Sequence, residues 1–306
     1  MIQTEQISKN FGDVQALSEV NLDIKEGELF GLIGPDGAGK TTLFRILTTL
    51  LLADNGKAKV AGWDVVEDYR KIRQHVGYMP GRFSLYPDLS VQENLEFFAT
   101  VFGSSIQENY ALIQDIYSQI EPFKDRKAGA LSGGMKQKLA LSCALIHRPK
   151  VLFMDEPTTG IDPVSRKELW EMLRKLKSEG ITLLVSTPYM DEASLCERVA
   201  LIQKGKIMTV DEPDKIRKTF SKPLWAVSSD QSMYKLLNNL RAYPETSSAY
   251  AFGEYIHLTL KQKHILESLK SYLKELGHHR LVINPIQATV EDRFMELMTT
   301  EETQGS

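Results

Sequence analysis

The sequence predicts an α/β protein with a parallel core sheet, followed by a small α+β domain. Between residues 29 and 203, apolar strand-like runs alternate with helical patterns, the order that builds a parallel sheet covered by helices. From residue 215 onward the order becomes β-α-β-β-α-β, which is typical of a ferredoxin-like domain. The length of 306 residues agrees with two domains, because one domain takes about 150 residues. We therefore expect domains over residues 1–214 and 215–306.

Composition and charge exclude several classes of protein. Hydrophobic residues make up 42% of the chain and charged residues 25%, which is ordinary globular usage and argues against disorder. The net charge of −3 gives no whole-chain electrostatic reason to bind DNA or RNA, so we expect no nucleic-acid partner. Only two cysteines occur, Cys143 and Cys196, which argues against a disulfide framework and a Cys-rich zinc site.

No segment of the sequence is expected to cross a bilayer. A spanning helix needs about 20 mainly apolar residues, whereas the best candidate, Ile46 to Ala53, is eight residues long and contains two threonines. The start, Met1 to Glu5, has neither the basic nor the apolar region of a signal peptide. We therefore expect a cytoplasmic protein that acts at a membrane only by docking on another chain.

The first elements are strands followed by a glycine-rich turn and a helix. Apolar residues from Ile2 to Phe11, and again from Val20 to Ile24, follow the pattern of strands. Leu29 to Ile33 is uniformly apolar and predicts a buried strand, and a helical pattern runs from Lys40 to about Leu52. Strand, glycine-rich turn and helix form the first half of a βα unit.

Helical spacing between Val91 and Lys124 predicts a helical arm at about residues 85–130, too short for a long coiled coil. Beyond it, helices and strands alternate, which implies a mostly parallel sheet covered on both faces. The expected elements are helix 133–147, strand 150–154, helix 163–178, strand 181–186, helix 190–196 and strand 198–203.

The last 92 residues follow a different order, in which strands are grouped in a hairpin. A turn at Gly253-Glu254 separates the two strands of residues 250–260. The remaining expected elements are strand 224–228, helix 232–240, helix 265–276, strand 281–286 and a short helix over 292–298.

A glycine-rich loop carries the first chemical motif, G-x-x-x-x-G-K-[ST], between the buried strand and the helix. Its glycines let backbone N–H groups converge on a phosphate chain at a helix N-terminus. Lys40 is placed to reach the β- and γ-phosphates and the Thr41 hydroxyl to ligate Mg²⁺, whereas a glycine-rich turn with this pattern by chance would lack the flanking strand and helix. The expected nucleotide-binding residues here are Gly34, Pro35, Asp36, Gly37, Ala38, Gly39, Lys40, Thr41 and Thr42.

Two further motifs accompany this loop. An apolar strand ends in Asp155 and Glu156, at the edge where the phosphate loop of the same sheet is expected. Asp155 can hold Mg²⁺ through water, and Glu156 can orient or deprotonate an attacking water, which makes Glu156 and Lys40 the catalytic candidates. The motif Ser132–Gly134 (Ser132, Gly133 and Gly134) opens a helix, where it serves as a plain N-cap and also forms an anion site.

These three motifs together resemble the nucleotide-binding subunits of ATP-binding cassette (ABC) transporters, over residues 1 to about 214. The resemblance implies a P-loop NTPase cassette with a parallel core sheet, an N-terminal antiparallel β part and the helical arm. It also implies ATP and Mg²⁺ as ligands, ATP hydrolysis as the activity, and a second ATPase subunit of the same or a sibling kind.

The resemblance assigns roles to further residues. Phe11 matches the aromatic residue that stacks on adenine, and Gly160 to Pro163 matches the loop that crosses the dimer interface. In the family, the motif matched by Ser132–Gly134 contacts the ATP held by the opposite subunit of a head-to-tail dimer. Residues 288–294 resemble the ending of the extra domain of the drug-resistance exporter branch. This branch implies a separate ABC-2 type transmembrane permease and a peripheral place on the cytoplasmic face of the cell membrane.

The sequence departs from the family pattern near the expected ATP site. Gly81 stands where a glutamine that touches Mg²⁺ and the attacking water is usual, and Pro188 stands where a histidine that bonds the γ-phosphate is usual. Asp36 replaces a common asparagine. Loss of one positioned donor costs about 10²–10³ in rate in other enzymes. Two readings stay open: a variant branch that keeps its activity, or an asymmetric dimer in which a sibling subunit hydrolyses most of the ATP.

Three functions are compatible with these features. The first is the ATPase subunit of an exporter, whose substrate selectivity would lie in the membrane subunit. The second is a soluble ABC ATPase outside transport, although such proteins usually carry a long coiled-coil insertion or two cassettes. The third is a regulatory subunit that binds ATP without hydrolysing it, for which Gly81 and Pro188 argue.

Overall fold

The computed structural model describes residues 1–82, 84–262 and 266–304. The chain divides into two compact units, Met1–Pro213 and Asp214–Ser306, and each is described here by itself. Within the described ranges, no helix is both long and apolar enough to span a lipid bilayer.

A six-stranded sheet forms the centre of the first unit, in the order β10-β9-β3-β8-β7-β6. All neighbouring strands are parallel except β10, which pairs antiparallel with β9. Strands β3, β7 and β8 are buried along their whole length, as expected of a sheet covered on both faces. The strands are β3 (Leu29–Ile33), β6 (Val76–Met79), β7 (Val151–Asp155), β8 (Thr182–Thr187), β9 (Arg198–Gln203) and β10 (Lys206–Asp211).

The register of this sheet brings three strand ends together. Ile33 pairs with Thr187 across β3 and β8, and Asp155 pairs with Ser186 across β7 and β8. The segments that follow β3, β7 and β8 therefore leave the sheet at one edge, where ligands bind in open α/β sheets.

An antiparallel sheet in the order β2-β1-β4-β5 forms a second layer, as expected for the N-terminal part. It comprises β1 (Ile2–Phe11), β2 (Val14–Ile24), β4 (Asn55–Val60) and β5 (Trp63–Asp64). Helix α1 (Lys40–Leu47) contacts β2 and β4 of this sheet and β7 of the other, and its apolar side chains join one core with both. Helix α1 ends five residues before the expected Leu52, because Thr49 adopts a left-handed φ of 64° that stops the helix.

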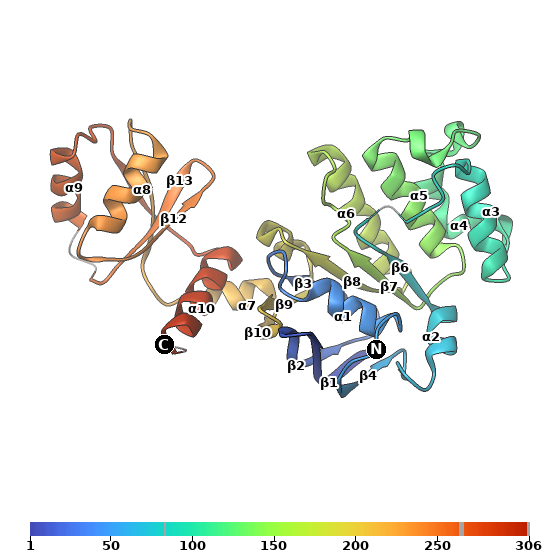
Figure 1. The fold of residues 1–306 in the computed structure, drawn as a ribbon. Coiled ribbons are helices and arrows are strands. Elements are labelled where there is room, and N and C mark those ends of the chain that lie inside the picture. Colours follow the sequence, from blue (N-terminus) through green and yellow to red (C-terminus); the bar gives the residue numbers. More distant parts are fainter. Residues whose placement is uncertain (83, 263–265, 305–306) are drawn as a thin grey trace. The chain divides into compact units, whose positions relative to one another are not determined.

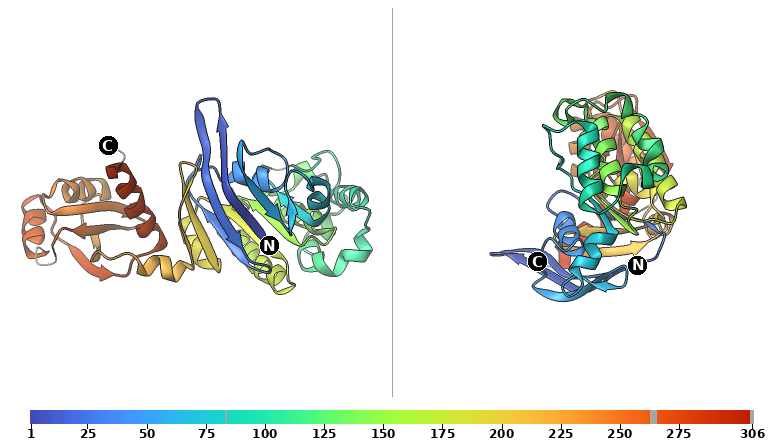
Figure 2. Two further views of the ribbon diagram at one scale, coloured as in Figure 1. Left: turned by 90° about the horizontal axis from the view of Figure 1, so that it is seen from below. Right: turned by 90° about the vertical axis from the view of Figure 1, so that its right-hand side faces the viewer.

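The helical arm lies at the opposite end of the unit from the antiparallel sheet, with the six-stranded sheet between them (Figures 1 and 2). It contains α3 (Val91–Val101), α4 (Ile106–Tyr117) and two short 3₁₀ turns, Glu121–Phe123 and Ala128–Ala130. Ser90 and Ser105 begin the two helices with complete capping boxes. Helix α5 (Gly133–Leu145) packs on α3, α4 and β6 and so connects the arm to the sheet.

Three more helical segments complete the first unit. Helix α2 (Tyr69–His75) precedes β6, and α6 (Pro163–Ser178) spans the expected residues and contacts β3 and β8. The segment expected as helix 190–196 is instead a 3₁₀ helix, η3 (Met190–Leu195). The chain enters the second unit through α7 (Pro213–Lys218).

The second unit has the β-α-β-β-α-β order expected of a ferredoxin-like domain. Its sheet has the order β12-β13-β11-β14, and every neighbouring pair is antiparallel. The final helix is longer than the expected 292–298, and Ile265, the first residue of the expected helix 265–276, lies outside the described residues. The elements are β11 (Leu224–Ser228), α8 (Met233–Ala242), β12 (Thr246–Phe252), β13 (Tyr255–Leu260), α9 (Leu266–Glu275), β14 (Val282–Ile286) and α10 (Val290–Gln304).

Candidate nucleotide site

The glycine-rich loop leaves the carboxyl end of β3 and packs tightly against neighbouring backbone. A Cβ atom at Gly34 would lie 2.2 Å from the carbonyl oxygen of Ile202. Gly39 has a φ of 105°, and a Cβ there would lie 2.4 Å from the carbonyl oxygen of Ala16. These two glycines are therefore required by packing and backbone conformation, and they place the start of α1 at the edge of the sheet.

Lys40, the first residue of α1, is almost fully buried and turns back toward its own loop. Its Nζ donates to the carbonyl oxygens of Gly34 (2.8 Å) and Pro35 (3.0 Å). The same Nζ lies 3.0 Å from Oε1 of Glu156, while Oδ1 of the exposed Asp36 is 4.0 Å away. The two catalytic candidates, Lys40 and Glu156, thus form an ion pair between the start of α1 and the segment that follows β7.

Asp155 and Glu156 are fixed by hydrogen bonds to β8. Ser186 Oγ donates to Oδ1 of Asp155 at 2.6 Å, and the Glu156 N–H donates to the Ser186 carbonyl oxygen (3.1 Å) and Oγ (3.0 Å). Glu156 has a φ of 52°, which costs a non-glycine residue about 1–3 kcal/mol unless its surroundings hold it. The bonds to Ser186 hold this conformation and direct the Glu156 side chain toward Lys40.

The oxygen donors at this edge fit Mg²⁺. Thr41 in the first turn of α1 supplies a hydroxyl, and Asp155 supplies a nearly buried carboxylate. Among the described residues, no group of three or more His, Cys, Asp or Glu side chains could hold a metal by itself. Mg²⁺ is usually bound by one or two protein oxygens together with phosphate oxygens and water, so this sparse donor set suits a nucleotide-bound ion.

Phe11 lies at the tip of the β1–β2 hairpin and is half exposed, with Lys9 Nζ 5.7 Å from its ring centre. Strand β2 of this hairpin contacts the phosphate loop, because Ala16 touches Gly39. The half-exposed Phe11 ring therefore belongs to the hairpin that contacts the phosphate loop. Thr42, the other residue expected to contact nucleotide in α1, is half-buried.

The motif Ser132–Gly134 begins α5, as the N-cap interpretation predicts. Ser132 Oγ accepts a hydrogen bond from the Met135 N–H at 3.3 Å. A Cβ at Gly133 would lie 3.6 Å from the carbonyl oxygen of Gly160, and one at Gly134 would lie 2.7 Å from Ser165 Oγ. The motif thus lies against the loop before α6 and the first turn of α6, while the phosphate loop lies against β2 and β9.

The two departures from the family pattern lie beside the acidic strand end. A Cβ at Gly81 would lie 2.9 Å from the carbonyl oxygen of Asp155, so the backbone here leaves no room for a side chain without a shift. Pro188 follows β8 directly and has no N–H, and the next N–H, that of Tyr189, donates to Thr187 Oγ1 at 3.1 Å. The sequence alone indicates only that a side chain is missing at Gly81. The structure adds that the backbone of Asp155 occupies the space that a Cβ atom would need.

Burial and the negative charge of Asp155 both affect the pKa of Tyr78, which lies near the end of β6. Burial raises the pKa of Tyr78 to about 12, and the negative charge of Asp155 adds to the rise. The phenol is therefore a neutral hydrogen-bonding group at physiological pH.

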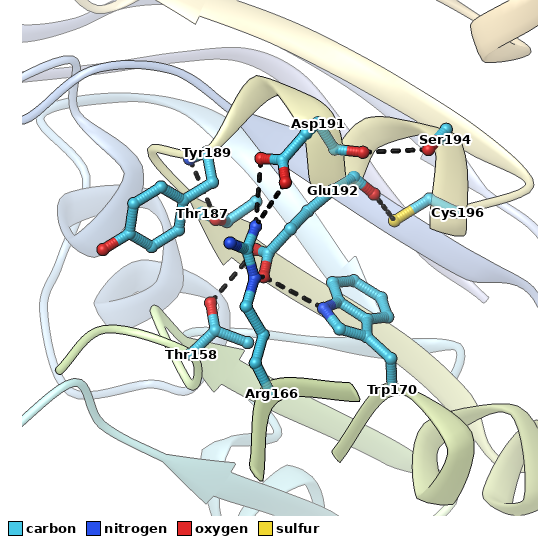
Figure 3. Close-up of polar contacts among 9 residues, drawn as sticks. All are labelled: Thr158, Arg166, Trp170, Thr187, Tyr189, Asp191, Glu192, Ser194 and Cys196. Carbon is cyan, nitrogen blue, oxygen red and sulfur yellow. Dashed lines mark hydrogen bonds and ion pairs between the residues drawn. The ribbon is translucent and has the colours of Figure 1, made fainter. Parts of the chain in front are cut away.

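Sequence reasoning missed one cluster next to this site. Glu192, in η3, is fully buried and bonds to side chains of α6 and of the loop after β7 (Figure 3). In the sequence, Asp191 and Glu192 stand in a short segment expected to be helical, and no motif signals that Glu192 is buried while Asp191 stays exposed.

Comparison with known proteins identifies relatives of this chain. A family model described as ABC transporter matches residues 17–159. The probable multidrug ABC transporter ATP-binding protein YbhF of Escherichia coli (strain K12) is 38% identical over 290 residues, covering 94% of this chain and 50% of YbhF, so the chain spans half the length of that relative. The Nod factor export ATP-binding protein I of Burkholderia lata is 40% identical over 215 residues, covering 69% of this chain and 71% of the relative. The daunorubicin resistance ATP-binding protein DrrA2 of Streptomyces coeruleorubidus is 39% identical over 220 residues, covering 71% and 68%.

Solved structures agree with these relatives. The dimeric ATP-binding cassette MJ0796 in a post-hydrolysis state with ADP and Pi superposes with a TM-score of 0.63 at 27% identity, covering 69% of this chain and 98% of that chain. A structure of the ATP-binding subunit of an ABC transporter gives a TM-score of 0.66 at 26% identity, covering 72% and 93%. The fold, the motifs and these similarities lead to one conclusion: the chain belongs to the ABC transporter family and is an ATP-binding protein of that family.

Proposed function

We propose that this chain is the ATPase subunit of an exporter and works in a dimer of two ATP-binding chains on a separate ABC-2 type permease. The observation that carries the proposal is that two candidate anion-binding segments of the chain lie on different elements with different surroundings, as two halves of a shared ATP site would. One half is the phosphate loop with Lys40, next to β2 and β9, and the other is the motif Ser132–Gly134, next to the loop before α6. The MJ0796 cassette, which is dimeric, supports a site shared by two chains.

ATP binding would rearrange the contacts of Lys40. The phosphate chain enters a loop whose N–H groups and helix N-terminus attract anions, and its oxygens replace the carbonyls of Gly34 and Pro35 as partners of Lys40 Nζ. Glu156 is then released from Lys40 and can accept a proton from the attacking water. Mg²⁺ held by Thr41 and Asp155 would neutralise charge on the phosphates.

A second chain would close the site from the other side. Ser132 and the N–H groups at the start of α5 form an anion-binding helix N-terminus, which suits the γ-phosphate of an ATP bound to the partner. The two chains would therefore hold ATP between them, with each chain's α5 facing the other's phosphate loop.

The two sites of this dimer are proposed to be unequal. This chain has no side chain at Gly81 to reach the attacking water and no donor at Pro188 to reach the γ-phosphate. Its own site is therefore expected to hold ATP and hydrolyse it slowly, while its Ser132–Gly134 motif completes the site of a sibling chain. A regulatory subunit without hydrolysis is the second candidate, and the same two positions favour it.

An apolar groove suits the proposed permease. It has a volume of about 380 Å³ and lies between the end of β6, α3 and α5, and it continues to Pro80, next to Gly81. A cytoplasmic helix of a membrane protein with an apolar face would fill it, which would place the chain on the cytoplasmic face of the membrane. Side chains that line the groove include Leu50, Tyr78, Phe98, Val101, Phe102 and His147.

Membrane co-purification tests this proposal. A tagged full-length chain, expressed in its native host and purified in mild detergent, is expected to bring with it a polytopic membrane protein and a second ATP-binding chain, and to turn over ATP. Replacing Val101 by Glu in the groove should release the membrane protein and leave ATP binding unchanged. Recovery of the chain with ribosomes or nucleic acid instead would support a soluble ABC ATPase and overturn the exporter proposal.

A further inference from the structure

A buried carboxylate outside the sequence motifs connects three segments around the nucleotide site. Glu192 is 0% exposed, and its Oε1 accepts hydrogen bonds from Arg166 Nε (2.6 Å) and Trp170 Nε1 (3.0 Å). Its Oε2 accepts from the hydroxyl of Thr158 at 3.1 Å. Figure 3 shows these side chains converging on Glu192 from α6 and from the loop after β7.

Arg166 neutralises this carboxylate and secures the segment after β8. Its Nη2 donates to both carboxylate oxygens of Asp191, at 2.9 and 3.0 Å, and its guanidinium carbon lies 4.7 Å from the ring centre of Tyr189. Burial alone would lower the pKa of Arg166, but the contacts with Glu192 and Asp191 raise it above its usual value. A buried charge held by this many partners fixes the segments that supply them.

Thr158 lies between two functional candidates on one loop. Glu156, two residues before it, has the left-handed φ of 52°, and its carbonyl oxygen accepts from the Thr159 N–H at 3.1 Å. Gly160, two residues after it, lies against Gly133 of the motif Ser132–Gly134. The bond from Thr158 to Glu192 therefore anchors the middle of the loop that carries both.

The same cluster reaches the phosphate loop through β8. The Gly34 N–H donates to the carbonyl oxygen of Thr187 at 3.2 Å, and Thr187 Oγ1 accepts from the Tyr189 N–H. Gly34 begins the phosphate loop, and Tyr189 packs on Arg166. A continuous path of contacts thus runs from the phosphate loop through η3 to Thr158.

We propose that Glu192 is a positioning residue of the nucleotide site: through Thr158 it holds the loop from Glu156 to Asp162 in the conformation that ATP hydrolysis requires. This inference rests on the proposed function, because it assumes that Glu156 and Gly160 act on ATP. Glu192 itself touches neither the phosphate loop nor the motif Ser132–Gly134, and it acts by fixing the segment between them.

Substitutions at Thr158 test the proposal most directly, because its hydroxyl makes the bond to Glu192. Thr158→Val keeps the shape of this buried side chain and removes only the bond to Glu192, whereas Thr158→Ser keeps the hydroxyl. Glu192→Gln gives a second route, because it weakens the bonds to Arg166 and Trp170 without a change of volume. Glu197→Gln is the matched control, since Glu197 also pairs with α6, through Lys177 at 2.6 Å, but does not contact Thr158.

Three measurements on the full chain decide the proposal: ATP turnover, affinity for an ATP analogue and hydrogen exchange. In the chain without its sibling, Thr158→Val should lower the slow turnover of ATP about tenfold, with the affinity for a fluorescent ATP analogue within about twofold of the parent, because misplacement of a catalytic group affects turnover more than binding. Hydrogen exchange should accelerate in residues 157–162 while the exchange of the β-sheet stays unchanged. Thr158→Ser and Glu197→Gln should resemble the parent, and the double variant of Thr158→Val and Glu192→Gln should be less than additive.

The outcomes separate this inference from the proposed function. Unchanged exchange in residues 157–162, or equal acceleration throughout the first unit, would show that Glu192 has a general structural role and would overturn the inference. Faster local exchange with unchanged kcat would overturn it as well. A parent chain that fails to bind ATP would refute the proposed function, while hydrogen exchange would still decide whether Glu192 fixes the loop.

Discussion

The two halves of the nucleotide site differ in what the chain supplies. The half around α5 keeps every residue of its motif, with Ser132 as N-cap, Gly133 against the loop before α6 and Gly134 against the first turn of α6. The half around the sheet edge keeps Lys40, Asp155 and Glu156 but has no side chain at Gly81 and no hydrogen-bond donor at Pro188. Under the proposed function, this difference predicts that the chain acts more effectively on a partner's ATP than on its own.

The largest effect is expected from Ser132→Arg, which changes the half around α5. In a reconstituted pair with the sibling chain, Ser132→Arg should reduce ATP turnover about 100-fold, because the side chain fills the anion site and the cap is lost. Glu156→Gln should reduce turnover only about twofold, since its site lacks two other groups. Steady-state ATPase assays measure both, and Ser105→Arg, which removes the cap of α4, controls for cap loss. Equal damage by Ser132→Arg and Glu156→Gln would mean that both sites hydrolyse ATP and that the halves do not differ in function.

Lys40→Ala tests the other half as a binding site. Removal of this cation should weaken nucleotide binding more than about tenfold, or about 1.4 kcal/mol, because the phosphates lose their main charged partner. Titration with a fluorescent ATP analogue measures the affinity. Lys177→Ala, which removes a cation paired with Glu197 on α6, should leave the affinity unchanged. If Lys40→Ala bound the analogue like the parent, the phosphate-loop assignment would be wrong.

The variant Gly81→Gln tests whether one added side chain increases ATP turnover at the half around the sheet edge. The new Cβ would start 2.9 Å from the carbonyl oxygen of Asp155, so we expect a loss of stability of about 1 kcal/mol and no gain in turnover. Thermal unfolding and ATPase assays of Gly81→Gln, alone and with Pro188→His, check this. A clear rise in ATP turnover in the double variant would show that the side chains at positions 81 and 188 are sufficient to restore hydrolysis at the half around the sheet edge.

Phe11→Ala should have a smaller effect on the same half. Loss of stacking on an exposed ring should cost about 1 kcal/mol of nucleotide binding, roughly fivefold in affinity, and reduce the preference for adenine. Competition of ATP, GTP and CTP against a fluorescent nucleotide measures both quantities. Tyr234→Ala, which removes an exposed aromatic ring from the second unit, should have no effect. An unchanged base preference in Phe11→Ala would place the adenine elsewhere.

The smallest effect is expected from removal of the second unit. A chain that ends at Pro213 retains every residue proposed to contact ATP, so its affinity for the nucleotide analogue should equal that of the full chain, provided that circular dichroism shows it folded. We expect the loss to appear instead in assembly with the sibling chain and permease. A folded truncated chain that no longer binds ATP would assign the second unit a role in the nucleotide site.

Most of the fold could be predicted from the sequence because its signals are local. Mainly apolar runs marked β3, β7 and the centre of β8, and the motifs that follow β3 and β7 were found by residue type and spacing alone. The differences lie at element ends, such as α1, which stops at Leu47, and at η3, which is a 3₁₀ helix. Ends depend on single backbone conformations such as that of Thr49, which spacing does not report.

What the sequence determined by itself was the chemistry of the phosphate loop, the capped glycines at α5 and the acids after β7, since each depends on residues adjacent in the chain. The tertiary structure alone decided that Lys40 pairs with Glu156, that Gly81 lies against Asp155 and that Glu192 is buried beneath Thr158. These contacts join segments far apart in sequence, and burial and partner choice follow from which segments the sheet brings together. For that reason Glu192, which nothing in the sequence marks as buried, is fully enclosed in the fold and bonds to the loop that follows β7.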